Sequence, residues 1–258
     1  MDLQLSGKVV LVTGGAQGIG AAICRAAAAE QAVPIIVDRD ERAGGALLEE
    51  IGIDRARFVA ADLAEPEQCR EAVTRSVEFF GRLDGLVNNA GTNDSVGLER
   101  GTPERFRESL RRNLLHYYDV THYALPALTR SRGAIVNIAS KVALTGQGNT
   151  SGYAAAKGGI LALTREWAAE LLPAGVRVNA VIPAEVMTPL YQRWLAGFTD
   201  PQEKLRSIVA RIPLGKRMTK TEEVAATTLF LLSPQAGHTT GQFLFVDGGY
   251  VHLDRALT

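Results

Sequence analysis

The strongest constraint on the fold of this chain is a regular alternation of short apolar runs with helix-like segments. Residues 8–13 (KVVLVT) are apolar and β-branched on both faces, which is typical of a buried parallel strand. Residues 19–31 follow as an alanine-rich helical segment. Because the alternation continues to the end of the chain, it predicts an α/β fold with a doubly wound parallel sheet of about seven strands and helices on both faces.

The predicted elements can be placed along the chain by residue number. Strands are predicted at residues 8–13, 35–38, 57–61, 83–88, 134–139, 176–182 and 243–246. Helices are predicted at residues 19–31, 66–80, 102–129, 151–172 and 222–232, with a looser region before the last of them. Pro126 is expected to end or kink the 102–129 segment. No linker interrupts the pattern, so residues 1–258 are interpreted as one domain.

The amino-acid composition limits which binding partners and which cellular compartment are expected. The 28 basic and 28 acidic residues cancel, which argues against a nucleic-acid or anionic-membrane partner and is compatible with ordered self-association. Cys24 and Cys69 lie in predicted helices, and buried free thiols in a reducing compartment are expected. With no metal-ligand cluster, no signal peptide and no bilayer-spanning apolar stretch in the sequence, a cytoplasmic protein without a metal is expected.

Polar and small residues follow the ends of the predicted strands. In open parallel sheets, ligands bind beyond the carboxyl ends of the strands. All the candidate motifs fall at these ends. Their shared position supports a ligand site there more strongly than any single motif does. The residues in question are Thr13, Asp38, Asp62, Asn88, Ser140 and Pro183.

A glycine-rich turn links the first strand to the first helix. In residues 13–20 (TGGAQGIG), glycines stand at Gly14, Gly18 and Gly20. Glycine allows a tight turn and close approach to a pyrophosphate, and the helix N-terminus adds free N–H groups and a positive dipole. Nucleotide binding is therefore favoured over an ordinary turn.

Asp38 ends the second strand and suits a carboxylate that accepts hydrogen bonds from the adenosine ribose. It would repel a 2′-phosphate, and Gln17 in the glycine turn offers no phosphate clamp, so NAD is favoured. Arg39 and Arg42 argue the other way, because a guanidinium beside the ribose can hold a phosphate. Use of NADP therefore stays open.

Two further strand ends are candidates for the cofactor site. Asp62 and Leu63 end the third strand, where a side chain can meet the adenine edge. Residues 88–91 (NNAG) end the fourth, where small residues let the chain pass close to a cofactor. Each is a weak signal alone, since Asp and Asn are ordinary turn residues.

Tyr153 and Lys157 stand four residues apart, so on a helix they share one face. A phenol titrates near ~10 in water and is a poor base at neutral pH. An ammonium about 4 Å away contributes roughly 4 kcal/mol at an effective dielectric of about 20, enough to lower the pKa of the phenol by up to roughly 3 units. A tyrosine so placed exchanges a proton with an alcohol or ketone, and Ser140 is in reach of the same oxygen.

Taken together, these motifs resemble the short-chain dehydrogenases/reductases over nearly the whole chain. The matching residues are Gly14, Gly18, Gly20, Asp62, residues 88–91, Asn113, Ser140, Tyr153, Lys157, Pro183, Thr188 and Pro189. The resemblance implies a single-domain Rossmann fold whose N-terminal half binds the cofactor and whose C-terminal half carries catalysis and substrate binding. It also implies a homotetramer.

The resemblance also implies roles for individual residues. Tyr153 is the expected general acid/base, and Lys157 lowers the pKa of that phenol and holds the nicotinamide ribose. Ser140 orients the substrate oxygen, and Asn113 holds a water that passes protons from Lys157 to solvent. Thr188 bonds the nicotinamide carboxamide. The expected cofactor-binding residues are Gly14, Gln17, Gly18, Ile19, Gly20, Asp38, Asp62, Leu63, Asn89, Ala90, Gly91, Tyr153, Lys157, Pro183, Val186 and Thr188.

One departure from the family pattern points to the substrate. The glycine that usually follows the proline after the sixth strand is Ala184 here, and Glu185 adds a carboxylate beside the expected nicotinamide position. Segments 146–153, 181–191 and 245–257 look like those of bacterial L-fucose dehydrogenases. Those enzymes oxidise the anomeric carbon of L-fucose, and of related sugars such as L-galactose and D-arabinose, to a lactone.

A sugar pocket needs several convergent hydrogen-bonding groups and often an aromatic face. The candidate substrate-binding residues are Ser140, Lys141, Gln147, Asn149, Tyr153, Glu185 and Trp194. For Trp194, core packing is an equal alternative to sugar contact. His252 and Arg255, in the tail, are interpreted as subunit interface first and substrate contact second.

Two alternatives remain open at this point. The same chemistry on another carbonyl, such as a 3-oxoacyl thioester or a secondary alcohol, is compatible with the motifs. A catalytically idle nucleotide-sensing module is the other, although the presence of Asn113, Ser140, Tyr153 and Lys157 speaks against it.

Overall fold

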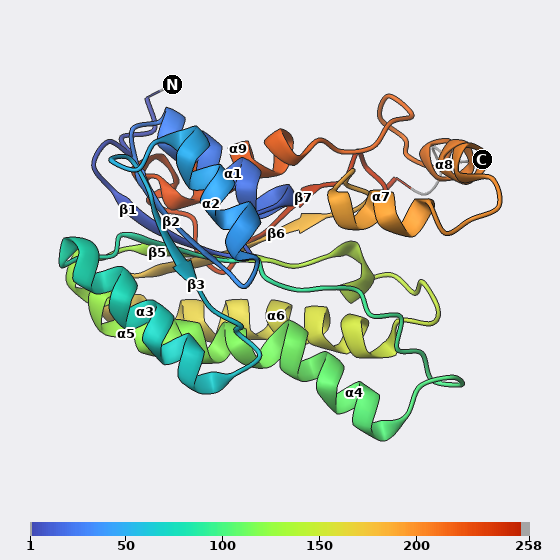
Figure 1. Ribbon diagram of the computed structural model, residues 1–258, viewed down its shortest axis with the longest axis horizontal. Coiled ribbons are helices and arrows are strands. Elements are labelled where there is room, and N and C mark those ends of the chain that lie inside the picture. The colour runs from blue at the N-terminus through green and yellow to red at the C-terminus, as the bar shows by residue number, and fades with distance from the viewer. Residues whose placement is uncertain (1, 254–258) are drawn as a thin grey trace.

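A sheet of seven parallel strands forms the centre of the molecule (Figure 1). The computed structural model describes residues 2–253. The strand order is β3-β2-β1-β4-β5-β6-β7, which confirms the predicted doubly wound α/β fold. The strands are β1 (Val9–Thr13), β2 (Val33–Asp38), β3 (Arg57–Ala60), β4 (Gly85–Asn88), β5 (Ala134–Ile138), β6 (Arg177–Pro183) and β7 (Phe243–Val246).

Alternate residues of the central strands face two separate cores. Val9 and Leu11 of β1 pack on one side of the sheet, and Val10 and Val12 pack on the other, as the two-residue period of a strand requires. Helices α3, α5 and α6 cover the first side, and α1, α2 and α9 cover the second (Figure 1). With both faces covered, the strands have to be apolar throughout, which explains the apolar runs in the sequence.

The helices follow the prediction in part. They are α1 (Gly18–Ala29), α2 (Glu41–Ile51), α3 (Pro66–Phe80), α4 (Pro103–Leu110), α5 (His116–Ser131), α6 (Ser151–Glu170), α7 (Pro189–Leu195), α8 (Pro201–Val209) and α9 (Thr221–Leu232). The sequence pattern did not predict α2, α7 or α8. All three begin with a side-chain cap, from Asp40, Thr188 and Asp200 respectively, and such caps favour a helix start even where the apolar period is short.

The segment predicted as one helix at 102–129 is divided by a π-helical turn, Arg111–Leu115, between α4 and α5. Pro126 does not end α5, which continues to Ser131. Its ring lies on the exposed face, where water can hydrogen-bond the backbone carbonyl that the missing N–H leaves free. The opposite face of α5, with Ala124 and Leu128, is fully buried against the sheet and holds the helix together.

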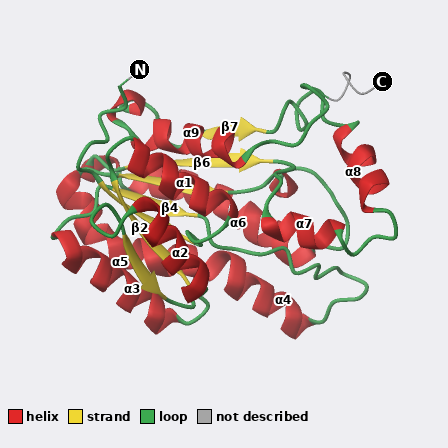
Figure 2. Ribbon diagram, turned by 45° about the horizontal axis from the view of Figure 1, so that its top comes forward, coloured by secondary structure: helices red, strands yellow, loops and turns green. Residues whose placement is uncertain are grey.

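The strand order reverses between β1 and β4, which makes this the switch point of the sheet. The glycine-rich turn after β1 and the segment after β4 meet there. Helices α7 and α8 stand beyond the carboxyl ends of β6 and β7 (Figure 2). The fold therefore gathers the predicted motifs at one edge of the sheet.

Cys24 and Cys69 are both free and buried, as the sequence predicted. Among residues 2–253, no group of His, Cys, Asp and Glu side chains is arranged to hold a metal ion. None of the helices in that range is long and apolar enough to cross a membrane.

Candidate active site

The glycine-rich turn packs so closely that side chains are excluded from it. Gly14 and Gly18 have φ of +60° and +56°, a region that favours glycine. A Cβ on Gly14 would lie 2.8 Å from the Cα of Ala90, and one on Gly20 would lie 2.1 Å from the carbonyl oxygen of Gly14. The turn is therefore pressed against the segment after β4 and against the first turn of α1.

Thr13 and Asn89 hold the turn in this position. The Thr13 hydroxyl accepts hydrogen bonds from the backbone N–H groups of Asn89 and Ala90, at 2.9 and 3.1 Å. The Asn89 amide donates to the carbonyl oxygens of Thr13 and Gly14. Asn88, by contrast, points into the protein, where its amide donates to Thr121 and Asn137. Of the two asparagines, Asn89 and not Asn88 therefore supports the nucleotide end.

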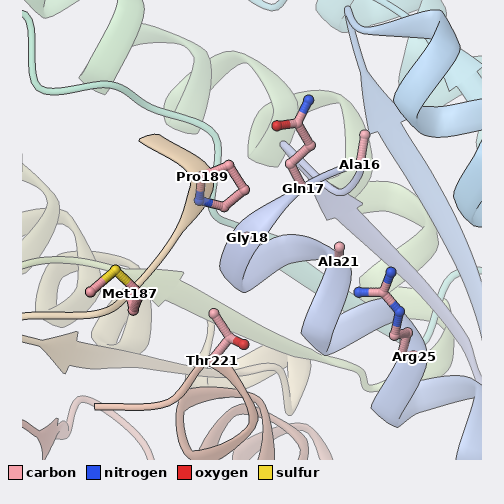
Figure 3. Close-up of a pocket in the computed structure, with 8 residues that line it drawn as sticks. All are labelled: Ala16, Gln17, Gly18, Ala21, Arg25, Met187, Pro189 and Thr221. Carbon is pink, nitrogen blue, oxygen red and sulfur yellow. The ribbon is translucent and has the colours of Figure 1, made fainter. Parts of the chain in front are cut away.

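The N-terminus of α1 fits a phosphate group. Gln17 stands at the N-cap but makes no capping hydrogen bond, so the first N–H groups of α1 have no side-chain partner. A cavity of about 310 Å³ opens here, lined by Gln17 and Gly18 on one side and by Met187 and Pro189 on the other (Figure 3). Free N–H groups at a helix N-terminus beside a cavity, with glycines that admit a close approach, fit the pyrophosphate of a dinucleotide.

Asp38 is half-buried and fixes the nucleotide end. Its carboxylate accepts hydrogen bonds from the backbone N–H groups of Ala16 and Asp40, at 3.1 and 3.0 Å. The Gln17 amide donates to the Asp40 carboxylate at 2.7 Å. Asp38 therefore sets the shape of the turn in addition to any contact with a ribose.

The two arginines next to Asp38 differ in their surroundings. Arg39 lies 3.8 Å from the Asp62 carboxylate, and this is an exposed pair. Arg42 is exposed on α2. Asp62 also accepts a hydrogen bond from Ala64 N–H, while its own N–H donates to Gln68. Both Asp62 and Arg39 thus lie at the β2–β3 end of the site, where the adenosine half of a dinucleotide was expected.

Thr188 brings the segment after β6 against the glycine turn. A Cβ on Gly18 would lie 3.3 Å from the Thr188 methyl group, and the Thr188 hydroxyl caps α7 by accepting from Tyr191 N–H. Val186 is buried and bridges to Thr219, which holds this segment in place. The structure therefore brings Thr188 against the glycine turn, with Val186 buried two residues before it.

Ser140, Tyr153 and Lys157 meet at the end of β5. Ser140 caps a short 3-10 helix, Lys141–Ala143, and its hydroxyl hydrogen-bonds the Tyr153 phenol and lowers its pKa. The Lys157 ammonium lies 5.6 Å from the centre of the Tyr153 ring. Both Tyr153 and Lys157 project from the first turns of α6, as their four-residue spacing predicted.

Burial acts against the expected tuning of the phenol by Lys157. It raises the pKa of Tyr153 to about 12, and the hydrogen bond with Ser140 lowers it. Burial also lowers the pKa of Lys157 to about 7, because the charged ammonium is taken out of water. The attraction between the two groups, from which the tuning was expected, competes with the removal of both from water.

Asn113 lies in the π-helical turn between α4 and α5 and is fully buried. Its side-chain oxygen accepts from Thr92 N–H at 2.7 Å, and its amide donates to the Ser109 carbonyl at 3.0 Å. Turns of this kind occur frequently at functional sites. The oxygen and the nitrogen of the side chain thus each have one protein partner.

Tyr117 is a member of this site that the sequence analysis missed. The Lys157 ammonium donates to the Tyr117 hydroxyl at 3.1 Å and to the Ile138 carbonyl at 2.7 Å. The signal was available, because Tyr117 stands four residues after Asn113, the spacing that places two residues on one helix face. It was not selected, because a tyrosine in an apolar helix is usually core.

A buried ion pair lies at the expected substrate end. Lys141 and Glu185 are in direct contact, and their side chains are 9% and 13% exposed. The Tyr191 hydroxyl donates to the second Glu185 oxygen at 2.7 Å, and the Lys141 ammonium lies 4.0 Å from the centre of the Tyr250 ring. The cluster joins the loop after β5, the segment after β6, α7 and the segment after β7.

The other substrate candidates differ in how they are placed. Gln147 and Asn149 are exposed in the loop before α6. Trp194 is 44% exposed and packs edge-on against Tyr191 and Phe198, so it joins an aromatic row along α7. In the tail, His252 packs on Phe245, and Arg255 lies outside the described residues.

Known proteins resemble the chain over most of its length. A family model described as Enoyl-(Acyl carrier protein) reductase matches residues 14–251. The L-fucose dehydrogenase of Oryctolagus cuniculus is 44% identical over 247 residues, which cover 95% of this chain and 86% of that protein. The 3-oxoacyl-(acyl-carrier-protein) reductase of Thermotoga maritima is 36% identical over 252 residues, 96% of this chain and all of that protein.

Solved structures of dehydrogenases are also similar to the chain over nearly its full length. The crystal structure of Cj0485 dehydrogenase is 46% identical, with a TM-score of 0.95 over 100% of this chain and 99% of that one. The structure of a short-chain dehydrogenase/reductase from Burkholderia xenovorans is 35% identical, with a TM-score of 0.90 over 95% of this chain and 97% of that one.

Proposed function

The chain belongs to the short-chain dehydrogenase/reductase family, and from this premise we propose that it oxidises the anomeric carbon of L-fucose, or of a related sugar, to the lactone with NAD. It is a dehydrogenase of CH–OH donors. One observation carries the choice of substrate: a relative that covers 95% of the chain at 44% identity is an L-fucose dehydrogenase. L-galactose and D-arabinose are the related sugars in the proposal.

The chain's own residues supply the proton chemistry. Tyr153 takes the proton of the anomeric hydroxyl, and Ser140 hydrogen-bonds the same substrate oxygen, because both hydroxyls point to one place at the end of β5. A nicotinamide dinucleotide held at the glycine turn would supply the acceptor for the hydride of the anomeric carbon. We propose that the proton then leaves Tyr153 by way of Lys157 and the π-helical turn at Asn113.

The Lys141–Glu185 pair supports a polyhydroxylated substrate. A carboxylate can accept about four hydrogen bonds and an ammonium can donate three, so both groups keep free capacity after they bind each other and Tyr191. Neighbouring hydroxyls of a sugar can donate to Glu185 and accept from Lys141. A fatty-acyl chain has no hydroxyl groups. It would displace water from Lys141 and Glu185 without replacing the hydrogen bonds that the water made.

The placement of Asp38 supports NAD over NADP. A carboxylate at the end of β2 accepts hydrogen bonds from ribose hydroxyls and repels a 2′-phosphate. Arg39, the nearest competing guanidinium, lies beside Asp62, which reduces its availability for a phosphate. The same proposal takes the protein to be a cytoplasmic homotetramer of single-domain subunits, which rests on the family resemblance.

A second candidate function is reduction of a 3-oxoacyl thioester. The identity of 36% to the Thermotoga maritima reductase, over all of that protein, favours it. It uses the same Ser140, Tyr153 and Lys157 in the opposite direction. The mixed loop after β5 and the buried Lys141–Glu185 pair fit this substrate less well than a sugar.

Initial rates with a panel of substrates test the proposal. The purified protein is expected to form NADH from L-fucose, with L-galactose and D-arabinose next, and to prefer NAD to NADP. The panel includes D-fucose as a stereochemical control, a secondary alcohol, and an acetoacetyl thioester with NADH and NADPH. Turnover of the thioester without turnover of any of the sugars would replace the proposal with the second candidate.

Replacing Glu185 with glutamine is expected to raise KM for L-fucose at least tenfold while KM for NAD changes little. The amide keeps the shape of the side chain but removes the charge that holds Lys141 and receives sugar hydroxyls. Glu203→Gln is the matched control, because Glu203 forms an exposed pair with Arg206 on α8. Steady-state kinetics with each substrate varied in turn measures both constants.

Loss of stability is separated from loss of binding by a double variant. Removing one partner of a buried pair destabilises a protein by about 3–5 kcal/mol, whereas replacing both partners with apolar groups is often neutral. Lys141→Met with Glu185→Leu is therefore expected to keep the thermal midpoint and still raise KM for L-fucose. A double variant with the original KM would show that the pair is only structural.

A further inference from the structure

The Lys157 ammonium is held by two oxygens that belong neither to Tyr153 nor to Ser140. It donates to the Ile138 carbonyl at 2.7 Å and to the Tyr117 hydroxyl at 3.1 Å. The Tyr117 hydroxyl itself donates to the same Ile138 carbonyl at 3.0 Å. The three groups therefore form a closed triangle between β5, α5 and α6.

This geometry fixes the direction of the Tyr117 hydroxyl. Its one proton is directed to Ile138, so a lone pair is left facing the ammonium. A buried tyrosine hydroxyl needs one partner to satisfy its burial, and Ile138 already provides it. The second hydrogen bond, from Lys157, is therefore not needed to satisfy the buried Tyr117 hydroxyl.

The triangle places the ammonium near both Gly91, in the segment after β4, and Tyr153. A Cβ on Gly91 would lie 3.8 Å from the Lys157 nitrogen and 3.0 Å from the Asn113 side-chain oxygen. Gly91 follows the segment that presses on the glycine turn. On the other side, the ammonium is 5.6 Å from the centre of the Tyr153 ring.

Within residues 2–253, the titratable groups that act on this position are few. Tyr117 and His116 face Lys157 from α5, and Tyr153 faces it from α6 itself. Burial lowers the pKa of His116 to about 4, so this ring is neutral at pH 7. No carboxylate forms an ion pair with Lys157 among the described residues, so oxygens of neutral groups have to stabilise the ammonium.

We propose that Tyr117 is a positioning residue for the reaction: its hydroxyl accepts a hydrogen bond from Lys157 and keeps the ammonium charged and beside Tyr153. The proposal rests on the dehydrogenase activity but on no particular sugar. It assigns Tyr117 no contact with substrate or cofactor. Its effect on turnover passes through Lys157.

The loss of the Tyr117 hydroxyl has a predictable effect on the pH dependence of oxidation, because that hydroxyl stabilises the charged form of Lys157. Burial already lowers the pKa of Lys157 to about 7, and removal of an accepting oxygen disfavours the charged form further, so the pKa of Lys157 falls. A less charged Lys157 stabilises the Tyr153 phenolate less, so the pKa of Tyr153 rises. Alcohol oxidation needs the phenolate, and the acid limb of its pH profile therefore moves to higher pH.

Tyr117→Phe tests the hydroxyl alone, because phenylalanine keeps the ring that lies 5.2 Å from the Lys157 nitrogen. We expect kcat/KM for oxidation at pH 7 to fall roughly tenfold, the acid limb to move up by about one pH unit, and the loss to be recovered at high pH. Tyr118→Phe is the matched control, because the neighbouring Tyr118 is 55% exposed. The control is expected to keep the wild-type profile.

A direct titration makes the test independent of the substrate. Protein labelled with ¹³Cε-lysine reports the ionisation of Lys157 by NMR, with its signal assigned from its absence in Lys157→Met. The pKa of Lys157 is expected to be lower in Tyr117→Phe than in the wild type or in Tyr118→Phe. Thermal midpoints measured on the same samples show that the variants are folded.

The outcomes separate the two proposals. An unchanged Lys157 titration, or a uniform loss of rate with no movement of the acid limb, would overturn the role of Tyr117. If the wild type oxidises none of the sugars, the proposed substrate fails, but the Lys157 titration still decides the role of Tyr117.

Discussion

Replacing Tyr153 with phenylalanine is expected to reduce alcohol oxidation at least about 1,000-fold while leaving dinucleotide binding nearly unchanged. General acid–base catalysis by a positioned side chain contributes about 10²–10⁴-fold, and in the proposed mechanism Tyr153, hydrogen-bonded by Ser140, exchanges a proton with the substrate oxygen. The variant keeps the aromatic ring and its packing beside Lys157. The effect should therefore fall on kcat, since the substitution removes an interaction needed in the transition state.

The measurement combines turnover with binding. Steady-state rates with L-fucose give kcat, and calorimetric titration with NAD gives the dissociation constant. Tyr118→Phe removes a hydroxyl from an exposed tyrosine of α5 and is expected to keep wild-type activity. A Tyr153→Phe protein with more than about a tenth of wild-type kcat would remove Tyr153 from the role of general base.

Replacing Gly20 with alanine is expected to weaken dinucleotide binding roughly 100-fold, equivalent to about 2.7 kcal/mol. The new Cβ would lie 2.1 Å from the Gly14 carbonyl oxygen and 2.7 Å from the Asn89 amide nitrogen. One of these has to move, and the hydrogen bond between them holds the turn in the shape that is proposed to admit a pyrophosphate. Overpacking of this kind also lowers the free energy of unfolding by about 1–3 kcal/mol.

Gly45→Ala is the matched control for this collision. Gly45 also lies within a helix, α2, but an added Cβ there would meet nothing within 4 Å. Alanine in place of an unhindered helical glycine is expected to stabilise the fold by up to about 1 kcal/mol and to leave NAD affinity unchanged. Calorimetric titration and thermal unfolding of both variants separate the two effects. Equal NAD affinities in the two variants would contradict the proposed role of the turn.

The predicted and observed structures agree most closely where a local pattern carries the information. The helix at residues 66–80 and the strand at residues 243–246 were predicted with the bounds the structure has. Helix α2 was missed because Gly44 and Gly45 weaken its helical pattern. The structure shows why Gly44 is tolerated: the Phe58 ring occupies the space where its side chain would be.

The sequence predicted which residues form the site better than it predicted the contacts between them. Ser140, Tyr153 and Lys157 were expected to meet, and they do. The pairing of Lys141 with Glu185, 44 residues apart, and the contact between Lys157 and Tyr117, 40 residues apart, join different elements. No spacing rule within one helix or strand can reveal such contacts.

The sequence by itself determined the alternation of strands and helices along the chain, the family, and the strand ends where the candidate residues lie. These depend on residue periodicity and on glycines and polar residues at fixed places along the chain, which are local properties. Only the tertiary structure decided the electrostatic state of Lys157 and Tyr153. Their pKa values depend on how much water the fold removes and on which oxygens it brings near, and both result from packing between β5, α5 and α6.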